Sequence, residues 1–296
     1  MTNKLELQDP RTQYARPPYD QQPLIDMPGH TGEMNPRPDH GEDSYQGSGL
    51  LKGLTAVVTG ADSGIGRAVA LAYAREGANV VISYLSEEVD ADETRKLVEA
   101  TGNEAICIAG DLTSESACEK LIGDAMRHFG KLDILVNNAA YQVTRDQIDA
   151  FSTEEFDRIL KTNVYAPFWL SRDALPKLTS GGSIINTVSI QGYEPSPELL
   201  PYAVTKSALI GMTKGLAKLA IDRGVRVNAV APGPVWTPLI PGSVEEEKVR
   251  QFGTNTLFGR AAQPAELAPL YVWLASPSAS YVTGEVFGAT GGRTPV

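Results

Sequence analysis

The sequence predicts a doubly wound α/β protein, in which helices cover both faces of a parallel sheet. Short runs rich in β-branched residues alternate with longer amphipathic stretches, the pattern expected of buried parallel strands joined by helical crossovers. The chain has 296 residues, 42% of them hydrophobic and 21% charged, so it can form one large domain with a substantial core. A glycine-rich segment also joins the first apolar run to the first helical stretch.

Seven apolar runs are the expected strands, and we predict that they form one seven-stranded sheet. They are residues 55–60, 79–84, 104–110, 132–138, 183–190, 225–231 and 285–289. Helical periodicity lies between them, for example over residues 66–77 and 152–175. No internal repeat of fixed period is present, so the sequence indicates a single doubly wound domain.

The first 48 residues differ from the rest of the chain. They hold seven prolines and few aliphatic residues, so they cannot bury enough apolar surface to fold alone. Two interpretations stay open: a disordered tail, or an extended arm that lies across the body or a neighbouring subunit. We therefore divide the chain into a proline-rich extension (residues 1–48) and the main α/β domain (residues 49–296).

Composition excludes several classes of function. A net charge of −10 argues against binding to nucleic acid or to an anionic membrane. No apolar run approaches a membrane span, and the N-terminus lacks a signal-peptide layout, so we expect a cytoplasmic protein. Two cysteines and three histidines form no pattern typical of a metal site or a histidine-based triad. We expect no metal, and proton chemistry must come from other residue types.

The segment TGADSGIG at the end of the first expected strand indicates a dinucleotide-binding site of the Rossmann type. Gly60, Gly64 and Gly66 lie where the strand passes into the next helix. Glycine allows a tight turn and a close approach to phosphate, and a helix N-terminus supplies free N–H groups. The spacing is Gly-x-x-x-Gly-x-Gly, which differs from the commonest dinucleotide pattern.

The segment PYAVTKSAL places Tyr202 four residues before Lys206. Residues at i and i+4 share one face of a helix, so the phenol and the ammonium are within reach of each other. The pair on its own is compatible with an ordinary polar stripe as well as with catalysis.

Five motifs in order resemble the short-chain dehydrogenase/reductase family over about residues 50 to 292. Besides TGADSGIG, they are NNAA at 137–140, Ser189 at 13 residues before Tyr202, Asn163 at 26 residues before Ser189, and PGPVWT at 232–237. Ala140 departs from the glycine usual in the family. The proline-rich N-terminus resembles that of a bacterial subgroup of stress-related oxidoreductases and aldehyde reductases.

The resemblance implies a catalytic tetrad of Asn163, Ser189, Tyr202 and Lys206. Tyr202 would exchange a proton with the substrate oxygen, and Ser189 would hydrogen-bond that oxygen. Lys206 would hold the nicotinamide ribose, and Asn163 would fix a water that links Lys206 to solvent. Because free tyrosine has a pKa of about 10, we expect Lys206 and the nicotinamide ring to lower the pKa of Tyr202.

The resemblance also implies the cofactor contacts. Asp111 would accept from the adenine amine, Asn138 and Ala139 would line the adenosine ribose, and Thr237 would bind the carboxamide. The full expected set is Gly60, Ser63, Gly64, Ile65, Gly66, Tyr84, Asp111, Leu112, Asn138, Ala139, Ala140, Tyr202, Lys206, Pro232, Gly233, Val235 and Thr237.

The end of the second strand bears on the choice between NAD and NADP. An acidic residue there selects NAD, and an arginine accepts the 2′-phosphate of NADP. Tyr84 and Leu85 are neither, but the acidic run at 87–93 follows. We keep both cofactors open, with a slight preference for NAD.

Three loops would form the substrate side: residues 141–151, 190–200 and 236–258, the last as a lid. Their apolar and aromatic residues suggest a small neutral aldehyde, ketone or alcohol; these are Tyr141, Tyr193, Leu199, Trp236, Leu239, Ile240 and Phe252. We therefore expect an NAD(P)-dependent carbonyl reductase or alcohol dehydrogenase. The alternatives are a glucose-like sugar dehydrogenase and a catalytically silent dinucleotide sensor or scaffold. The resemblance further implies a homotetramer.

Overall fold

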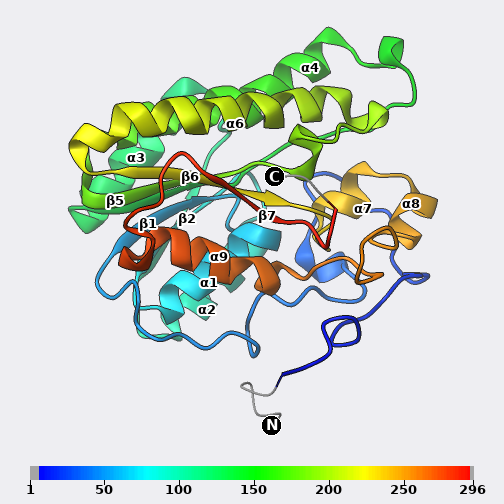
Figure 1. The fold of residues 1–296 in the computed structure, drawn as a ribbon, viewed down its shortest axis with the longest axis horizontal. Helices are drawn as coiled ribbons and strands as arrows, with labels where there is room; N and C mark the ends of the chain where they lie inside the picture. The colour runs from blue at the N-terminus through cyan, green and yellow to red at the C-terminus, as the bar shows by residue number, and fades with distance from the viewer. Residues whose placement is uncertain (1–6, 294–296) are drawn as a thin grey trace.

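The computed structural model describes residues 7–293 and contains one seven-stranded parallel sheet (Figure 1). Its strand order is β3-β2-β1-β4-β5-β6-β7. The strands are β1 (Thr55–Thr59), β2 (Asn79–Tyr84), β3 (Ala105–Ala109), β4 (Leu132–Asn137), β5 (Leu178–Thr187), β6 (Arg226–Pro232) and β7 (Val286–Ala289). The predicted doubly wound fold is confirmed.

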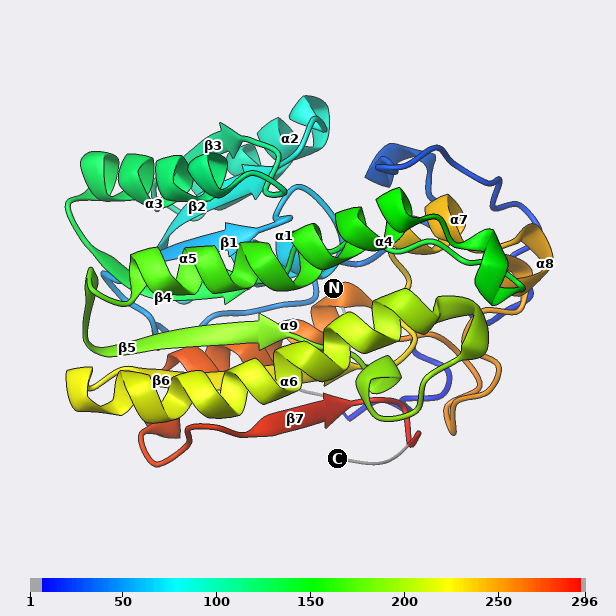
Figure 2. The same cartoon turned by 90° about the horizontal axis from the view of Figure 1, so that it is seen from above.

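Helices cover both faces of the sheet (Figures 1 and 2). One face carries α1 (Gly64–Arg75), α2 (Glu88–Glu99) and α9 (Pro264–Ala275). The other carries α3 (Glu115–Phe129), α4 (Thr153–Leu160), α5 (Ala166–Ala174) and α6 (Leu200–Ala220). Two short helices, α7 (Leu239–Ser243) and α8 (Glu246–Arg250), lie beyond the carboxyl end of the sheet.

The strand residues divide between two hydrophobic clusters because successive side chains of a strand point to opposite faces. In β1, Ala56 and Val58 pack with α1 and α9, whereas Val57 packs with α3 and α5. All five residues of β1 are buried, which explains its continuous apolar sequence.

Six of the seven expected strands match the observed ones to within one residue at each end. The exception is β5, expected over 183–190 but observed at Leu178–Thr187. Leu178 pairs with Leu132 of β4, and a register shift separates this bridge from the pairing that begins at Ser183. The strand therefore begins before its expected start, at the Leu178 bridge, and its last residue pair with β6 is Thr187 with Val230.

The sheet reverses its winding between β1 and β4. The chain moves outward from β1 to β2 and β3, then returns to place β4 on the other side of β1. The loops that leave the carboxyl ends of β1 and β4 therefore diverge. A place where the strand order reverses in this way is a topological switch point, and open α/β sheets bind ligands there.

Residues 7–48 extend along the body of the same chain, with one short 3-10 helix at Thr31–Glu33 (Figure 1). Tyr19, Ile25 and Met34 are buried against Trp236 and its neighbours. The division of the chain at residue 48 stays a prediction.

Among residues 7–293, no helix has the length and apolar character that crossing a bilayer requires.

Candidate active site

A cavity of about 650 Å³ lies at the carboxyl ends of the strands and brings most of the expected site residues together. Its lining includes Ser189, Tyr202, Lys206, Gly60, Ser63, Gly64, Ile65, Tyr84, Asp111, Leu112, Asn138, Ala139, Ala140, Pro232, Gly233, Val235 and Thr237. The expected residues Gly66 and Asn163 are not part of this lining and have supporting positions instead.

The glycine segment forms a cradle that fits a dinucleotide pyrophosphate. Gly60 and Gly64 have φ angles of +60° and +51°, which side-chain-bearing residues rarely adopt. A Cβ on Gly66 would lie 1.9 Å from the carbonyl oxygen of Gly60, so only glycine permits this close packing of α1 on β1. The N-terminus of α1, with its free N–H groups, consequently faces the cavity at Gly64 and Ile65.

Asn138 joins the glycine segment to the neighbouring strands. Its side-chain Nδ2 donates to the carbonyl oxygens of Thr59 at 3.0 Å and Gly60 at 3.2 Å. Its Oδ1 accepts from the Thr187 hydroxyl. The side-chain amide that we expected at the adenosine ribose is thus engaged within the protein, and it fixes the loop geometry.

Ser189, Tyr202 and Lys206 converge where β5 ends and α6 begins. Lys206 is 2% exposed, and its Nζ donates to the carbonyl oxygen of Thr187 at 2.7 Å. The same Nζ lies 5.3 Å from the centre of the Tyr202 ring. Tyr202 is 8% exposed and interacts through its hydroxyl with Ser189. The i, i+4 pair therefore faces the cavity rather than forming a solvated stripe.

Burial dominates the titration of this pair. It raises the pKa of Tyr202 to about 12, although the hydrogen bond with Ser189 acts in the opposite direction. It lowers the pKa of Lys206 to about 7. In the protein by itself the pKa of Tyr202 is therefore not lowered, because loss of hydration disfavours both charged forms. The expected lowering includes the nicotinamide ring and stays a prediction. A phenol that keeps its proton is suited to act as a proton donor.

Asn163 holds the loop that follows β4. It lies in a π-helical turn, Lys161–Tyr165, between α4 and α5. Its Oδ1 accepts from the backbone N–H of Tyr141 at 2.8 Å, and its Nδ2 donates to the carbonyl of Tyr141 and the hydroxyl of Thr205. Asn163 thus fixes one wall of the cavity to α6, a contact that the spacing in the sequence did not predict.

Two carboxylates that sequence reasoning missed lie beside the end of β2. Asp62 and Glu87 line the cavity together with Tyr84, and both are buried. Burial raises the pKa of Asp62 to about 6, and the nearby negative charges of Glu87 and Asp90 add to this shift. The acidic run at 87–93 was the sequence signal available for Glu87. No pattern in the sequence marked Asp62 as a site residue.

Asp111 lies at the exposed edge of the cavity beyond β3. Its Oδ1 accepts from the backbone N–H of Thr113 at 2.9 Å, so it stabilises the turn that leads into α3. Ser114 occupies the N-cap position of α3. Asp111 still lines the cavity together with Leu112 and Thr113.

All three loops that we expected on the substrate side contribute residues to the cavity lining. Tyr141, Leu199, Leu239, Ile240 and Phe252 line the cavity as predicted. Trp236 does not, because it is fully buried beneath the N-terminal segment. Tyr193 packs instead against the hydrophobic cluster that contains Val188 and Leu209. The polar side chains of Gln142 and Thr144 bind Ser243 and thereby join the loop after β4 to α7.

Three residues of the N-terminal segment also line the cavity: Met27, Pro28 and Gly29. Sequence reasoning missed them because the segment shows no periodicity and lies more than 30 residues before the glycine loop. Only the tertiary arrangement brings them to the site.

The fold and the site define a dinucleotide-binding oxidoreductase with a Ser-Tyr-Lys centre. Residues 60–294 match the family model described as enoyl-(acyl carrier protein) reductase. The chain belongs to the short-chain dehydrogenase/reductase family and is an NAD(P)-dependent enzyme that acts on CH–OH groups.

Relatives align with nearly the whole chain. The uncharacterized oxidoreductase YghA of Escherichia coli K12 is 50% identical and covers 97% of this chain and 98% of its own length. Glucose and ribitol dehydrogenase of Daucus carota is 43% identical, with 90% and 95% covered. NADPH-dependent aldehyde reductase 1, chloroplastic, of Arabidopsis thaliana is 42% identical, with 90% and 95% covered.

Solved structures agree with this assignment. A short chain dehydrogenase from Burkholderia cenocepacia J2315 in complex with NADP is 31% identical, with a TM-score of 0.77 over 82% of this chain and 98% of that one. A blue fluorescent protein from a metagenomic library in complex with NADPH is 30% identical, with a TM-score of 0.77 over 83% and 100%. These comparisons support a nicotinamide cofactor but give the preference for NAD no support.

Proposed function

We propose that this protein interconverts a small neutral aldehyde or ketone and its alcohol, with Tyr202 as the general acid and base. The observation that carries the proposal is the convergence of Ser189, Tyr202 and Lys206 in the same cavity as the glycine cradle. We propose that the expected residues that line the cavity, from Gly60 to Thr237, contact the cofactor as the family resemblance implies.

The nicotinamide cofactor, when bound, supplies or accepts the hydride. In the reducing direction, the Tyr202 hydroxyl donates its proton to the substrate oxygen as negative charge develops there. The Ser189 hydroxyl donates a hydrogen bond to the same oxygen. Lys206 is held by Thr187 beside the phenol, so in its protonated form its positive charge stabilises the phenolate that remains. In the oxidising direction, the phenolate takes the proton back from the alcohol.

Replacing Tyr202 with phenylalanine tests this assignment. The variant keeps the aromatic ring but lacks the hydroxyl group that donates the proton. We therefore expect kcat for carbonyl reduction to fall by about 10²–10⁴-fold. Tyr193→Phe is the matched control, since Tyr193 lies outside the cavity lining and should retain full activity. Undiminished reduction by Tyr202→Phe would show that the assignment is wrong, and would leave the silent sensor or scaffold as the better explanation.

The substrate class follows from the wall of the cavity, where Leu199, Leu239, Ile240 and Phe252 are apolar. An apolar wall favours an aldehyde or ketone over a polyol. The alternative is a sugar dehydrogenase, which the name of the carrot relative supports. Absorbance at 340 nm with a panel of aldehydes, ketones, sugars and alcohols distinguishes them.

The choice of cofactor depends on Asp62 and Glu87. Two buried carboxylates next to Tyr84 favour a ribose diol and repel a 2′-phosphate, which supports NAD. The name of the Arabidopsis relative supports NADPH instead. Dissociation constants for NADH and NADPH, measured by the fluorescence of the bound cofactor, decide between them.

We also propose a cytoplasmic homotetramer. Apolar side chains on the outer faces of α5 and α6 support self-association, since Phe168, Val204 and Leu219 are 52%, 44% and 72% exposed. Light scattering at micromolar concentration tests the assembly, and a monomer would contradict it.

A further inference from the structure

The N-terminal segment crosses the mouth of the cavity from one wall to the other. We use "strap" for residues 19–37 and keep "lid" for residues 236–258, which include α7 and α8. The strap begins against the lid, passes Met27–Gly29 along the cavity and reaches α2, on the side of the expected adenosine site.

The first anchor of the strap is on the lid. The backbone N–H groups of Tyr19 and Ile25 donate to the carbonyl oxygens of Arg250 at 2.9 Å and Pro241 at 3.2 Å. The rings of Tyr19 and Trp236 lie 4.1 Å apart, and the indole N–H of Trp236 donates to the carbonyl oxygen of Pro36 at 2.8 Å. The strap and the lid thus share one small hydrophobic core.

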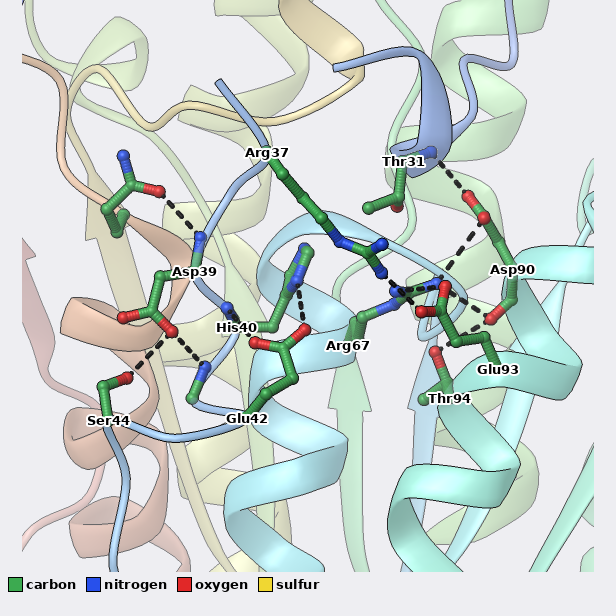
Figure 3. A network of polar contacts seen from close by, with 12 residues as sticks. Thr31, Arg37, Asp39, His40, Glu42, Ser44, Arg67, Asp90, Glu93 and Thr94 are labelled. Carbon is green, nitrogen blue, oxygen red and sulfur yellow. Dashed lines mark hydrogen bonds and ion pairs between the residues drawn. The ribbon is translucent and has the colours of Figure 1, made fainter. Parts of the chain in front are cut away.

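The second anchor is on α2 (Figure 3). The backbone N–H of Thr31 donates to the buried carboxylate of Asp90 at 2.7 Å. Arg37 forms an ion pair with Glu93, which also binds Arg67 at 3.0 Å. Arg67 is fully buried, and its Nε donates to the carbonyl oxygen of Asp62 in the glycine segment. This anchor therefore connects the strap to the loop that cradles the cofactor.

Between the two anchors, the strap packs tightly on the lid. A Cβ on Gly29 would lie 3.0 Å from the carbonyl oxygen of Pro238 and 2.3 Å from Ile25 Cδ1. A Cβ on Gly242 of α7 would lie 2.6 Å from the sulfur of Met27. Pro238 follows Thr237 in the chain, and a Cβ on Gly64 of the cradle would lie 3.1 Å from the Thr237 side chain. Met27–Gly29 thus form part of the wall that faces the glycine cradle.

We propose that Met27–Gly29 of the strap are part of the cofactor-binding site: they close the cleft over the dinucleotide, which leaves only after this part of the strap detaches. The proposal rests on the binding of a nicotinamide dinucleotide in this cleft. A ligand held between the cradle and the strap must break contacts with one of them to leave, so the strap sets the dissociation rate. By linkage, the bound cofactor also stabilises the docked strap.

Two glycines of the strap provide a matched test in the full-length protein. Gly29→Val places a side chain against Pro238 and Ile25, whereas a Cβ on Gly32 meets no atom within 4 Å. Stopped-flow fluorescence would measure the dissociation of NADH and of NADPH, with excess oxidised cofactor as the trap. We expect Gly29→Val to raise the dissociation rate of the bound form about tenfold, equivalent to about 1.4 kcal/mol. Gly32→Val should stay within about twofold of the wild type, a change of about 0.4 kcal/mol.

Hydrogen exchange gives a second readout that needs no variant. The amides of residues 25–31 should exchange more slowly in the wild-type protein when NADH or NADPH is bound. Equal dissociation rates for the two glycine variants, together with unchanged exchange, would overturn the strap's role. A wild-type protein that binds neither NADH nor NADPH would instead overturn the proposed function on which the strap depends.

Discussion

The glycine segment and the strap face each other across one cavity, but they are built in different ways. The glycine segment is determined by nearby residues, since Gly60, Gly64 and Gly66 set its backbone and its packing on the adjacent strand. The strap is held by partners far away in the chain, such as the Trp236–Pro36 pair at a separation of 200 residues. One wall of a site can therefore be specified by a local sequence motif, while the opposite wall is formed only by contacts between residues far apart in the chain.

The largest effect should come from removing the ring that joins the strap to the lid. Trp236 is fully buried between Tyr19 and Phe252, so Trp236→Ala should lower the free energy of unfolding by about 3–5 kcal/mol. Trp236→Phe keeps an aromatic ring but loses the hydrogen bond to Pro36. The loss of that bond should lower the free energy of unfolding by about 1 kcal/mol. Urea denaturation measures both variants. A loss below 1 kcal/mol for the alanine variant would mean that the strap contributes little to the lid.

The glycine segment, which forms the wall opposite the strap, can be tested with a substitution that clashes with its backbone. In Gly66→Ala the new methyl group would overlap the Gly60 carbonyl oxygen, so we expect a loss of about 3 kcal/mol in stability and weaker binding of NADH and NADPH. Gly123→Ala is the control, because a Cβ there meets nothing within 4 Å and alanine favours the helix by up to about 1 kcal/mol. Unchanged cofactor affinity in Gly66→Ala would contradict the role of the tight turn.

The pH dependence of the free energy of unfolding tests the protonation of Asp62 in the glycine segment. Because the pKa of Asp62 rises from 3.8 to about 6 on folding, the native protein keeps a proton that the unfolded chain releases between these values. Stability should therefore fall as pH rises from about 4 to about 6, by roughly 2–3 kcal/mol. Asp62→Asn should remove this contribution. A pH profile of urea denaturation that is identical for the two proteins would contradict the assignment.

The smallest effect should come from the ion pair at the edge of the strap. Arg250 binds Asp20 at 2.5 Å, but these side chains are 44% and 59% exposed. Solvent screens such pairs, so Arg250→Ala should cost less than about 1 kcal/mol in the free energy of unfolding. A larger loss by urea denaturation would show that charge, rather than the apolar cluster around Trp236, holds the strap.

Much of the site was predictable because its signals are local. The strand before TGADSGIG and the helix after it require only their own residues, and the i, i+4 spacing of Tyr202 and Lys206 fixes their common face. One expectation failed for reasons of burial: Trp236 is covered by the strap rather than facing substrate. Burial also raises the pKa of Tyr202 in the protein by itself. Burial depends on every neighbour, and a short motif does not contain that information.

The sequence by itself determined the doubly wound sheet and the glycine cradle, because periodicity and short spacings act through adjacent residues. It predicted the Ser-Tyr-Lys centre only through the family resemblance, since the i, i+4 spacing of Tyr202 and Lys206 alone is also compatible with a polar stripe. The tertiary structure alone decided that Asp62 and Glu87 lie together at the end of β2 and that Met27–Gly29 close the cleft. These residues come from separate segments without regular periodicity, and contacts with the lid and with α2 define their places. Chain topology, rather than local preference, completes the site.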